Sequence, residues 1–237
     1  LNTGAVWLSQ LLGETRFYDY VQRFGFGQPT GIVLGGEISG LVRTPANTPT
    51  TWQPVDMATN SFGQGISATP LQVISAVSAI ANNGIMMQPR IVKNIITEGN
   101  HNEQSPKEIR RVISGRSAQE LKEMMSIAAE SISTNYLDVP GYEIGGKSGT
   151  AQTIHTDGQY EEETYISSFA GIAPLTNPII AVLVKIDEPE DVPWGSVVAA
   201  PAFGNIAKAT LSYFCITMSS RHVVGKSTLV NRYNRHS

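Results

Sequence analysis

The chain has 237 residues, of which 41% are hydrophobic, and this is enough to bury the core of one large domain or two small ones. A formal net charge of -3 and a pI near 5.8 give no basic surface for nucleic acid or for an anionic membrane. A single cysteine, Cys215, excludes a disulfide framework and a C-x-x-C metal or redox site, and no apolar run approaches the ~20 residues of a membrane span.

The first half of the sequence predicts helices separated by one long irregular segment. Residues 3–13 and 15–24 have helical spacing of apolar residues, with Thr15 as the N-cap of the second helix. Between residues 25 and 54, Gly, Pro and Thr are frequent and no period is sustained, so irregular structure is predicted, with short strands near residues 31–34. Loops of this length in compact domains are often functional.

Two further helices follow. One is predicted to begin after Thr69, with Pro70 at its first position, and to end at Asn82-Asn83-Gly84. The other is predicted to begin at Ser117, because Ser117-Ala-Gln-Glu120 has the pattern of a capping box. Apolar residues at helical spacing are expected to form its buried face: Leu121, Met124, Met125 and Ala128.

From residue 144 onward the pattern changes to strands. Strands are predicted over residues 144–154, 164–173 and 179–186, and the short link between the last two favours an antiparallel hairpin. A helix over about residues 202–214 presents apolar side chains on one face and is expected to pack on this sheet. The fold class predicted is therefore α+β, an antiparallel sheet with packed helices.

The first of these strands contains Gly145-Gly-Lys-Ser-Gly-Thr-Ala-Gln-Thr153, in which one lysine stands among small and hydroxylated residues. Glycines weaken a strand and mark places where another backbone comes close. A strand lysine is ordinarily a solvated surface residue. The glycines beside Lys147 suggest instead that something lies against this strand.

Lys147-Ser148-Gly149 is the third motif of the signature of penicillin-binding proteins and class A β-lactamases. Other stretches resemble class B penicillin-binding proteins in the same order along the chain: residues 62–72, 81–84, 89–90, 168–174 and 199–203. The resemblance runs from about residue 2 to 214. It implies that residues 1–214 are the C-terminal part of a transpeptidase domain, lacking the N-terminal portion of that fold. The resemblance does not extend to residues 215–237, which contain basic residues but no Asp or Glu from Thr217 onward, and this atypical tail is expected to be disordered.

The resemblance also implies an activity and a set of site residues. Transpeptidases of this family cleave a D-alanyl-D-alanine bond through a serine acyl-enzyme and pass the acyl group to an amine of a neighbouring stem peptide. Lys147 would supply positive charge, Ser148 and Thr150 would bind the substrate carboxylate, and Gly149 would let the substrate backbone approach. The Thr150 N–H would be an oxyanion donor. Asn2 would be the asparagine of the S-x-N motif, or else a simple helix N-cap.

The expected partners are peptidoglycan stem peptides and β-lactam antibiotics, and cell-wall synthesis or division proteins are further candidates. No cofactor, metal or nucleic acid is expected. The resemblance places the parent protein at the extracytoplasmic face of the bacterial cell membrane, held by an N-terminal anchor that is not in this sequence. The chain begins at Leu1 without a methionine, which also suggests a piece of something longer.

The sequence departs from the family at the nucleophile. The S-x-x-K motif needs a serine three residues before a lysine, so that both lie on one face of a helix. The residues at that spacing before the seven lysines are Arg90, Gln104, Gln119, Ile144, Val182, Asn205 and Val223. The chain alone is therefore expected to be inactive. The alternative is a non-catalytic module that binds peptidoglycan or a division partner, and an S-x-x-K upstream in the parent gene would favour the enzyme.

Two other patterns are weaker. Gly225-Lys-Ser-Thr228 resembles the end of a phosphate-binding loop, but Ser220 stands where that pattern needs glycine. His155 and Asp157 could suggest a Ser-His-Asp hydrolase, but no G-x-S-x-G motif accompanies them, and a solvated hairpin tip is the preferred interpretation.

Overall fold

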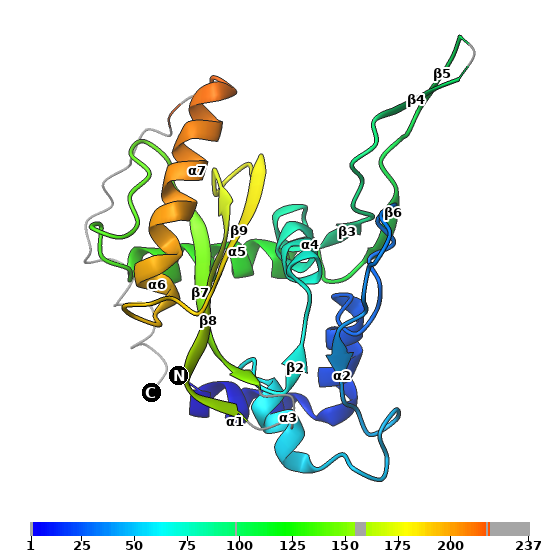
Figure 1. The fold of residues 1–237 in the computed structure, drawn as a ribbon, viewed down its shortest axis with the longest axis vertical. Helices are drawn as coiled ribbons and strands as arrows, with labels where there is room; N and C mark the ends of the chain where they lie inside the picture. Colours follow the sequence, from blue (N-terminus) through cyan, green and yellow to red (C-terminus); the bar gives the residue numbers. More distant parts are fainter. Residues whose placement is uncertain (1, 98, 155–159, 217, 219–237) are drawn as a thin grey trace.

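The computed structural model describes residues 2–97, 99–154, 160–216 and 218. They form an α+β fold, as predicted, in which helices pack on both faces of a three-stranded antiparallel sheet (Figure 1). The candidate sites His155–Asp157 and Gly225–Thr228, and nearly all of the tail after Ile216, lie outside the described residues. No helix in the described ranges is both long and apolar enough to cross a membrane.

The sheet consists of β7 (Gly145–Ile154), β8 (Tyr160–Ala173) and β9 (Ile180–Asp187), in the order β7-β8-β9. Both pairs are antiparallel, which confirms the predicted strands and the hairpin between the last two. Because side chains alternate between the faces of a strand, this register decides which residues of β7 share a face. Ser148 lies opposite Phe169, which lies opposite Val184.

One face of the sheet is covered by α6 (Gly195–Val198) and α7 (Ala200–Tyr213). The rings of Phe169 and Phe203 are 4.8 Å apart between centroids, and both side chains are fully buried. Around them lies the main hydrophobic core of the described residues, which includes Leu211 and the inward-facing valines of β9. The predicted C-terminal helix is thus confirmed, on the face where its apolar residues were expected to pack.

Helices α4 (Pro70–Ala81) and α5 (Gly115–Glu130) lie on the other face. The start of α4 is as predicted, with Thr69 and Gln72 forming a capping box behind Pro70. Gln72 is buried, and its amide also donates to the carbonyls of Gln28 and Ser39, each at 2.7 Å. The side chain that caps α4 therefore also fixes the long irregular segment.

The prediction for α5 was wrong in two details. The N-cap is Ser114, whose hydroxyl accepts from the Ser117 N–H at 3.0 Å, so the helix begins before the predicted capping box. Met124 is 61% exposed, whereas Ala118, Lys122 and Ala129 are buried. The fully buried positions of α5 are therefore two alanines and one lysine, and Met124 is not among them.

The N-terminal region contains α1 (Asn2–Leu12), α2 (Glu14–Arg23) and α3 (Pro54–Asn60), with a short pair formed by β1 (Leu41–Val42) and β2 (Ile66–Ser67). The two predicted helices are confirmed. The expected N-cap at Thr15 was wrong, because Gly13 occupies that position with a φ of 81°, a conformation that suits glycine. The helix α3 was not predicted.

No strand forms near residues 31–34, contrary to the prediction. This segment is instead a loop closed by the Glu37 carboxylate, which accepts from the N–H groups of Thr30 at 2.7 Å and Gly31 at 3.1 Å and from the Thr30 hydroxyl. Its apolar residues Val33 and Leu34 are exposed and find no neighbouring strand to pair with among the described residues.

A ribbon of four short strands connects α4 to α5. It comprises β3 (Ile85–Met87), β4 (Asn94–Thr97), β5 (Asn100–Glu103) and β6 (Glu108–Arg111), and its β4–β5 end projects away from the body (Figure 1). The Arg110 Nε donates to the Arg23 carbonyl at 2.9 Å, so the base of the ribbon is attached to the end of α2. These strands were not predicted.

Candidate active site

The predicted site centres on β7, an edge strand of the sheet in the described part of the chain. Ser148 and Thr150 lie opposite Phe169 and Ser167, on the face covered by α6 and α7. Lys147 and Gly149 alternate with them and face α4 and α5. The structure therefore places the four residues side by side on one strand but divides them between its two faces.

The glycines of β7 are required by the packing of this chain itself. A Cβ on Gly146 would lie 2.4 Å from the Phe169 ring, and a Cβ on Gly145 would lie 2.8 Å from Leu175. A Cβ on Gly149 would lie 2.6 Å from the Ser168 hydroxyl. At these glycines the faces of the strand are thus filled by neighbouring side chains, so a ligand that lies beside them has to follow the free edge.

Lys147 places its positive charge close to the backbone of the next residue. Its side chain is exposed, and its Nζ donates to the Ser148 carbonyl at 2.6 Å. In a strand, the N–H and C=O groups of alternate residues point to the same edge, so the Ser148 carbonyl and the Thr150 N–H share an edge. The lysine ammonium therefore lies near the edge to which the Thr150 N–H points.

Thr150 is held from the α6 side. Its Oγ1 accepts a hydrogen bond from the Gly195 N–H at 3.3 Å, and its side chain is half-buried. The neighbouring Ser167 is fully buried and donates to the Pro193 carbonyl at 2.5 Å. Sequence analysis missed both Gly195 and Ser167, because they come from segments far from the motif and only the strand pairing brings them to it.

Asn2 is the first residue of α1 and is exposed. It borders a small cavity of about 260 Å³ together with Thr3, Val6, Trp7, Gln10 and Phe62. No residue of β7 lines this cavity, so it does not bring Asn2 and Lys147 together. The role of Asn2 remains a prediction.

A cavity of about 610 Å³ adjoins β7 just beyond Thr150, on the face opposite α7. It lies between the loop after α3 and the sheet, and residues from all three strands line it, including Ala151, Ile166 and Leu183. Lys185 and Asp187 form an ion pair at its border. Its β7 residues follow directly after the motif and Thr150.

A second cavity, of about 520 Å³, continues the first toward α2. The two share four lining residues, and the second is almost entirely apolar apart from Asn60, which is 6% exposed. The Asn60 Nδ2 donates to the Tyr18 hydroxyl at 3.1 Å, but its buried Oδ1 has no hydrogen-bond partner in the described residues. Buried polar atoms are normally paired, so this acceptor is suited to a donor that enters the cavity. The shared residues are Gly63, Ile66, Ala68 and Val73.

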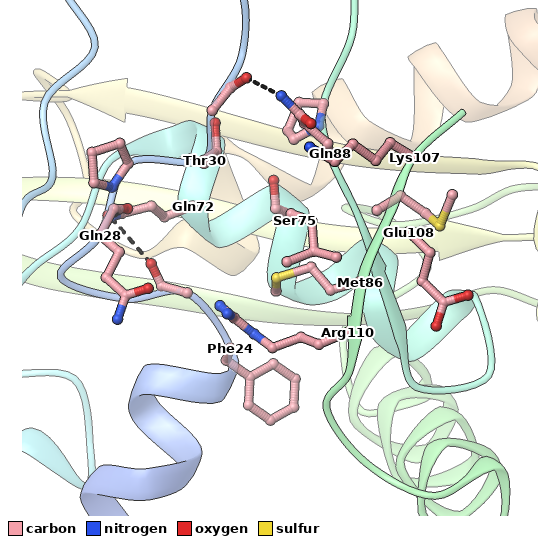
Figure 2. Close-up of a pocket in the computed structure, with 16 residues that line it drawn as sticks. Phe24, Gln28, Thr30, Gln72, Ser75, Met86, Gln88, Lys107, Glu108 and Arg110 are labelled. Carbon is pink, nitrogen blue, oxygen red and sulfur yellow. Dashed lines mark hydrogen bonds between the residues drawn. The ribbon is translucent and has the colours of Figure 1, made fainter. Parts of the chain in front are cut away.

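A third cavity, of about 420 Å³, lies between α4, the end of α2 and the β3–β6 ribbon (Figure 2). Figure 2 shows Met86 and Arg110 on one side of it, facing Phe24 and Gln28. None of the predicted site residues lines it. The amides of Gln72 and Gln88 are already bonded to backbone carbonyls there, so this cavity is not part of the candidate active site.

The described ranges contain no group of three or more His, Cys, Asp or Glu side chains that could hold a metal ion. The groups gathered at β7 are instead the Lys147 ammonium, the Ser148 and Thr150 hydroxyls, and the backbone groups of the free strand edge. Such groups can bind an anionic peptide and stabilise developing negative charge. A nucleophile with its base is not among them.

The family model for the penicillin-binding protein transpeptidase domain matches residues 1–208. The chain therefore belongs to this family, and its relatives are class B penicillin-binding proteins, which confirms the resemblance inferred from the β7 motif. It is 40% identical over 215 residues to stage V sporulation protein D of Bacillus subtilis strain 168, covering 89% of this chain and 32% of that protein. It is 37% identical over 219 residues to penicillin-binding protein PbpB of Mycobacterium tuberculosis, covering 87% of this chain and 31% of that protein.

Solved structures agree. Penicillin-binding protein 3 of Mycobacterium tuberculosis in complex with ampicillin superposes with a TM-score of 0.83 at 35% identity, covering 93% of this chain and 50% of that one. The transpeptidase domain of Burkholderia pseudomallei penicillin-binding protein 3 gives a TM-score of 0.78 at 31% identity, with 93% and 63% coverage. The chain thus spans about a third of the length of its curated relatives.

Proposed function

We propose that this chain is the C-terminal part of the transpeptidase domain of a peptidoglycan D,D-transpeptidase that acts through a serine acyl-enzyme. The observation that carries the proposal is the Lys147-Ser148-Gly149 motif on the edge strand β7, with the lysine ammonium beside a free strand edge. A related structure with the same fold is a complex with ampicillin. Residues 1–214 form the domain, and residues 215–237 are an appended tail.

In this proposal the donor peptide lies along the edge of β7 as an added strand, as peptides do on other exposed sheet edges. The Thr150 N–H donates to the developing oxyanion, and the Ser148 and Thr150 hydroxyls bind the terminal carboxylate. Lys147 supplies positive charge that favours this carboxylate and assists proton transfer at the nucleophile. The ligand classes are stem peptides ending in D-alanyl-D-alanine and the β-lactams that mimic them. The site acts outside the cytoplasmic membrane.

The nucleophile is supplied from outside these 237 residues, because none of the seven lysines has a serine three residues before it. Two adjoining cavities support this proposal: the one beside β7 has a mixed polar and apolar lining, and the one that continues it is almost entirely apolar and contains Asn60, whose buried Oδ1 has no partner in the described residues. An apolar segment carrying a hydrogen-bond donor would suit the second of these cavities. The absence of an S-x-x-K motif from these residues also favours a second candidate function, a module that binds peptidoglycan or a division partner without catalysis.

The test is labelling with a fluorescent penicillin, followed by denaturing gel electrophoresis. The chain alone is expected to form no covalent adduct, because the acyl bond needs a serine activated by a nearby base. The chain extended upstream in its own gene through an S-x-x-K motif is expected to be labelled in a one-to-one ratio. A matched control replaces the serine of that motif with alanine and should abolish labelling.

Each alternative result has a meaning. Stoichiometric labelling of the short chain, lost on mutation of one of its own serines, would show that a nucleophile within these residues was missed. A parent gene without an S-x-x-K upstream would favour the non-catalytic binding module.

A further inference from the structure

The segment Pro193-Trp194-Gly195 lies against the same face of the sheet as the Thr150 side chain. Two hydrogen bonds attach it: the Ser167 hydroxyl donates to the Pro193 carbonyl at 2.5 Å, and the Gly195 N–H donates to the Thr150 Oγ1 at 3.3 Å. Thr150 and Ser167 are directly opposite each other in the β7–β8 register, so their side chains are neighbours. The segment is therefore fixed by two adjacent hydroxyls.

Only glycine can occupy position 195 in this arrangement. A Cβ there would lie 2.3 Å from the Ser168 carbonyl oxygen and 2.4 Å from that of Gly149. Both atoms belong to the backbone of paired strands and cannot rotate away as a flexible side chain would. Any larger residue would have to push the segment off the sheet, which would withdraw its N–H from Thr150.

The bond from Gly195 determines what the Thr150 hydroxyl can do. A hydroxyl has one proton to donate and two lone pairs. One lone pair accepts from Gly195, and the hydroxyl donates to no residue in the part of the chain that the structure describes. Its proton is therefore available to an acceptor that approaches the half-buried side chain. A carboxylate only accepts hydrogen bonds, and bonds to a charged acceptor are the stronger ones.

We infer that Gly195, held by Ser167, is a positioning residue that orients the Thr150 hydroxyl as a donor to the terminal carboxylate of a bound peptide. This inference rests on the proposed function of β7. It extends that function to residues 193–195, which are not part of the Lys147-Ser148-Gly149 motif. It predicts that loosening Pro193–Gly195 weakens carboxylate recognition without changing any residue that touches the ligand.

The experiment compares two ligands, N-acetyl-D-alanyl-D-alanine and its C-terminal amide, titrated by NMR into this chain. The measured quantity is the ratio of the two dissociation constants. Thr150→Val should lower the preference for the carboxylate roughly tenfold, as expected for one hydrogen bond to a charged group, and Thr150→Ser should retain most of it. Ser167→Ala should lower it by about threefold, and should have no further effect in the Thr150→Val background.

Ser9→Ala is the matched control, since Ser9 is also a buried serine whose hydroxyl donates to a backbone carbonyl, that of Val6 at 2.8 Å. It should leave the ratio unchanged. Gly195→Ala should act like Ser167→Ala, and its control is Gly204→Ala, where the nearest atom to a new Cβ is 3.5 Å away. If Gly195→Ala does not fold, the Ser167 variants decide the matter.

The outcomes separate two kinds of failure. Suppose that the unmodified chain prefers the carboxylate. If Ser167→Ala leaves this preference unchanged, or lowers it by the same factor in the Thr150→Val background, the inference is overturned but the proposed function of β7 is not. An unmodified chain that binds neither peptide, or both equally, would contradict the proposed function of β7 and this inference with it.

Discussion

The sheet region and the N-terminal region differ in where their apolar side chains lie. In the sheet region, Phe169, Phe203 and Leu211 are completely buried between β8, β9 and α7. In the N-terminal region, Trp7 is 59% exposed and Leu11 is 65% exposed on α1. Apolar surface of this kind on a soluble domain usually marks a contact with another segment or protein. The first region has its packing partners in this chain, and the second lacks them among the described residues.

The largest test of this comparison is Phe203→Ala, in the well-packed region. Removal of a buried phenylalanine leaves a cavity beside Phe169, and we expect a loss of about 3–5 kcal/mol in the free energy of unfolding, measured in urea. Tyr213→Ala is the control on the same helix, because Tyr213 is 81% exposed, and it should change stability by no more than about 0.5 kcal/mol. Equal losses would mean that α7 is not anchored by this core.

The second test concerns the site that the packed region supports. In the chain extended through S-x-x-K, Lys147→Ala should slow acylation by penicillin roughly 100-fold, which corresponds to ~2.7 kcal/mol, the lower end of the range for the loss of one preorganised electrostatic contact. Stopped-flow measurement with a fluorescent penicillin gives this rate. Lys208→Ala, an exposed lysine on α7, is the control and should leave it unchanged. An unchanged rate in Lys147→Ala would remove the lysine from the mechanism.

The same contrast explains which parts of the fold could be predicted from the sequence. The strands of the sheet and α7 were predicted because their residues meet each other, so the pattern of β9 and the apolar face that includes Phe203 carry the full information. The start of α4 was predicted because a cap is local, with Thr69 and Gln72 three residues apart. Where a local signal had a close competitor, as with Ser114 and Ser117 before α5, the prediction was wrong.

The features that could not be predicted depend on contacts between distant residues. The loop closed by Glu37 has a sequence that suits a short strand, and only the Thr30 and Gly31 donors show that it is a closed loop. The Lys147 motif was found because its residues are contiguous. The role of Gly195 was not found from the sequence, because its hydrogen bond to Thr150 spans 45 positions and depends on the β7–β8 register.

The third test lies in the N-terminal region. Leu11→Gln should change the stability of this chain by less than about 0.5 kcal/mol, because the side chain is already exposed. If α1 has a packing partner in the longer protein, the same substitution there should cost about 1–3 kcal/mol, comparable to burying a polar amide in a core. Light scattering of the short chain adds a second measure, since exposed apolar surface promotes association and Leu11→Gln should reduce it. If the short chain is monomeric and melts cooperatively, the interpretation that α1 lacks its packing partner is contradicted.

The smallest expected effect concerns Glu37, which closes the loop at residues 30–37. Its pKa lies below the ordinary value of 4.5, chiefly because the Thr30 hydroxyl donates to the carboxylate; desolvation opposes this shift, and the N–H groups of Thr30 and Gly31 add to it. A carboxylate with a lowered pKa in the folded state stabilises the fold above the unfolded value and loses this contribution as the pH falls through the folded value. The stability difference between the unmodified chain and Glu37→Gln should therefore be constant above about pH 5 and shrink below pH 4.5.

Solvent screening keeps this stability difference small, so melting temperatures should be compared across closely spaced pH values. Thr30→Val removes the leading cause and should flatten this pH dependence; a dependence that survives Thr30→Val unchanged would mean that another group closes the loop.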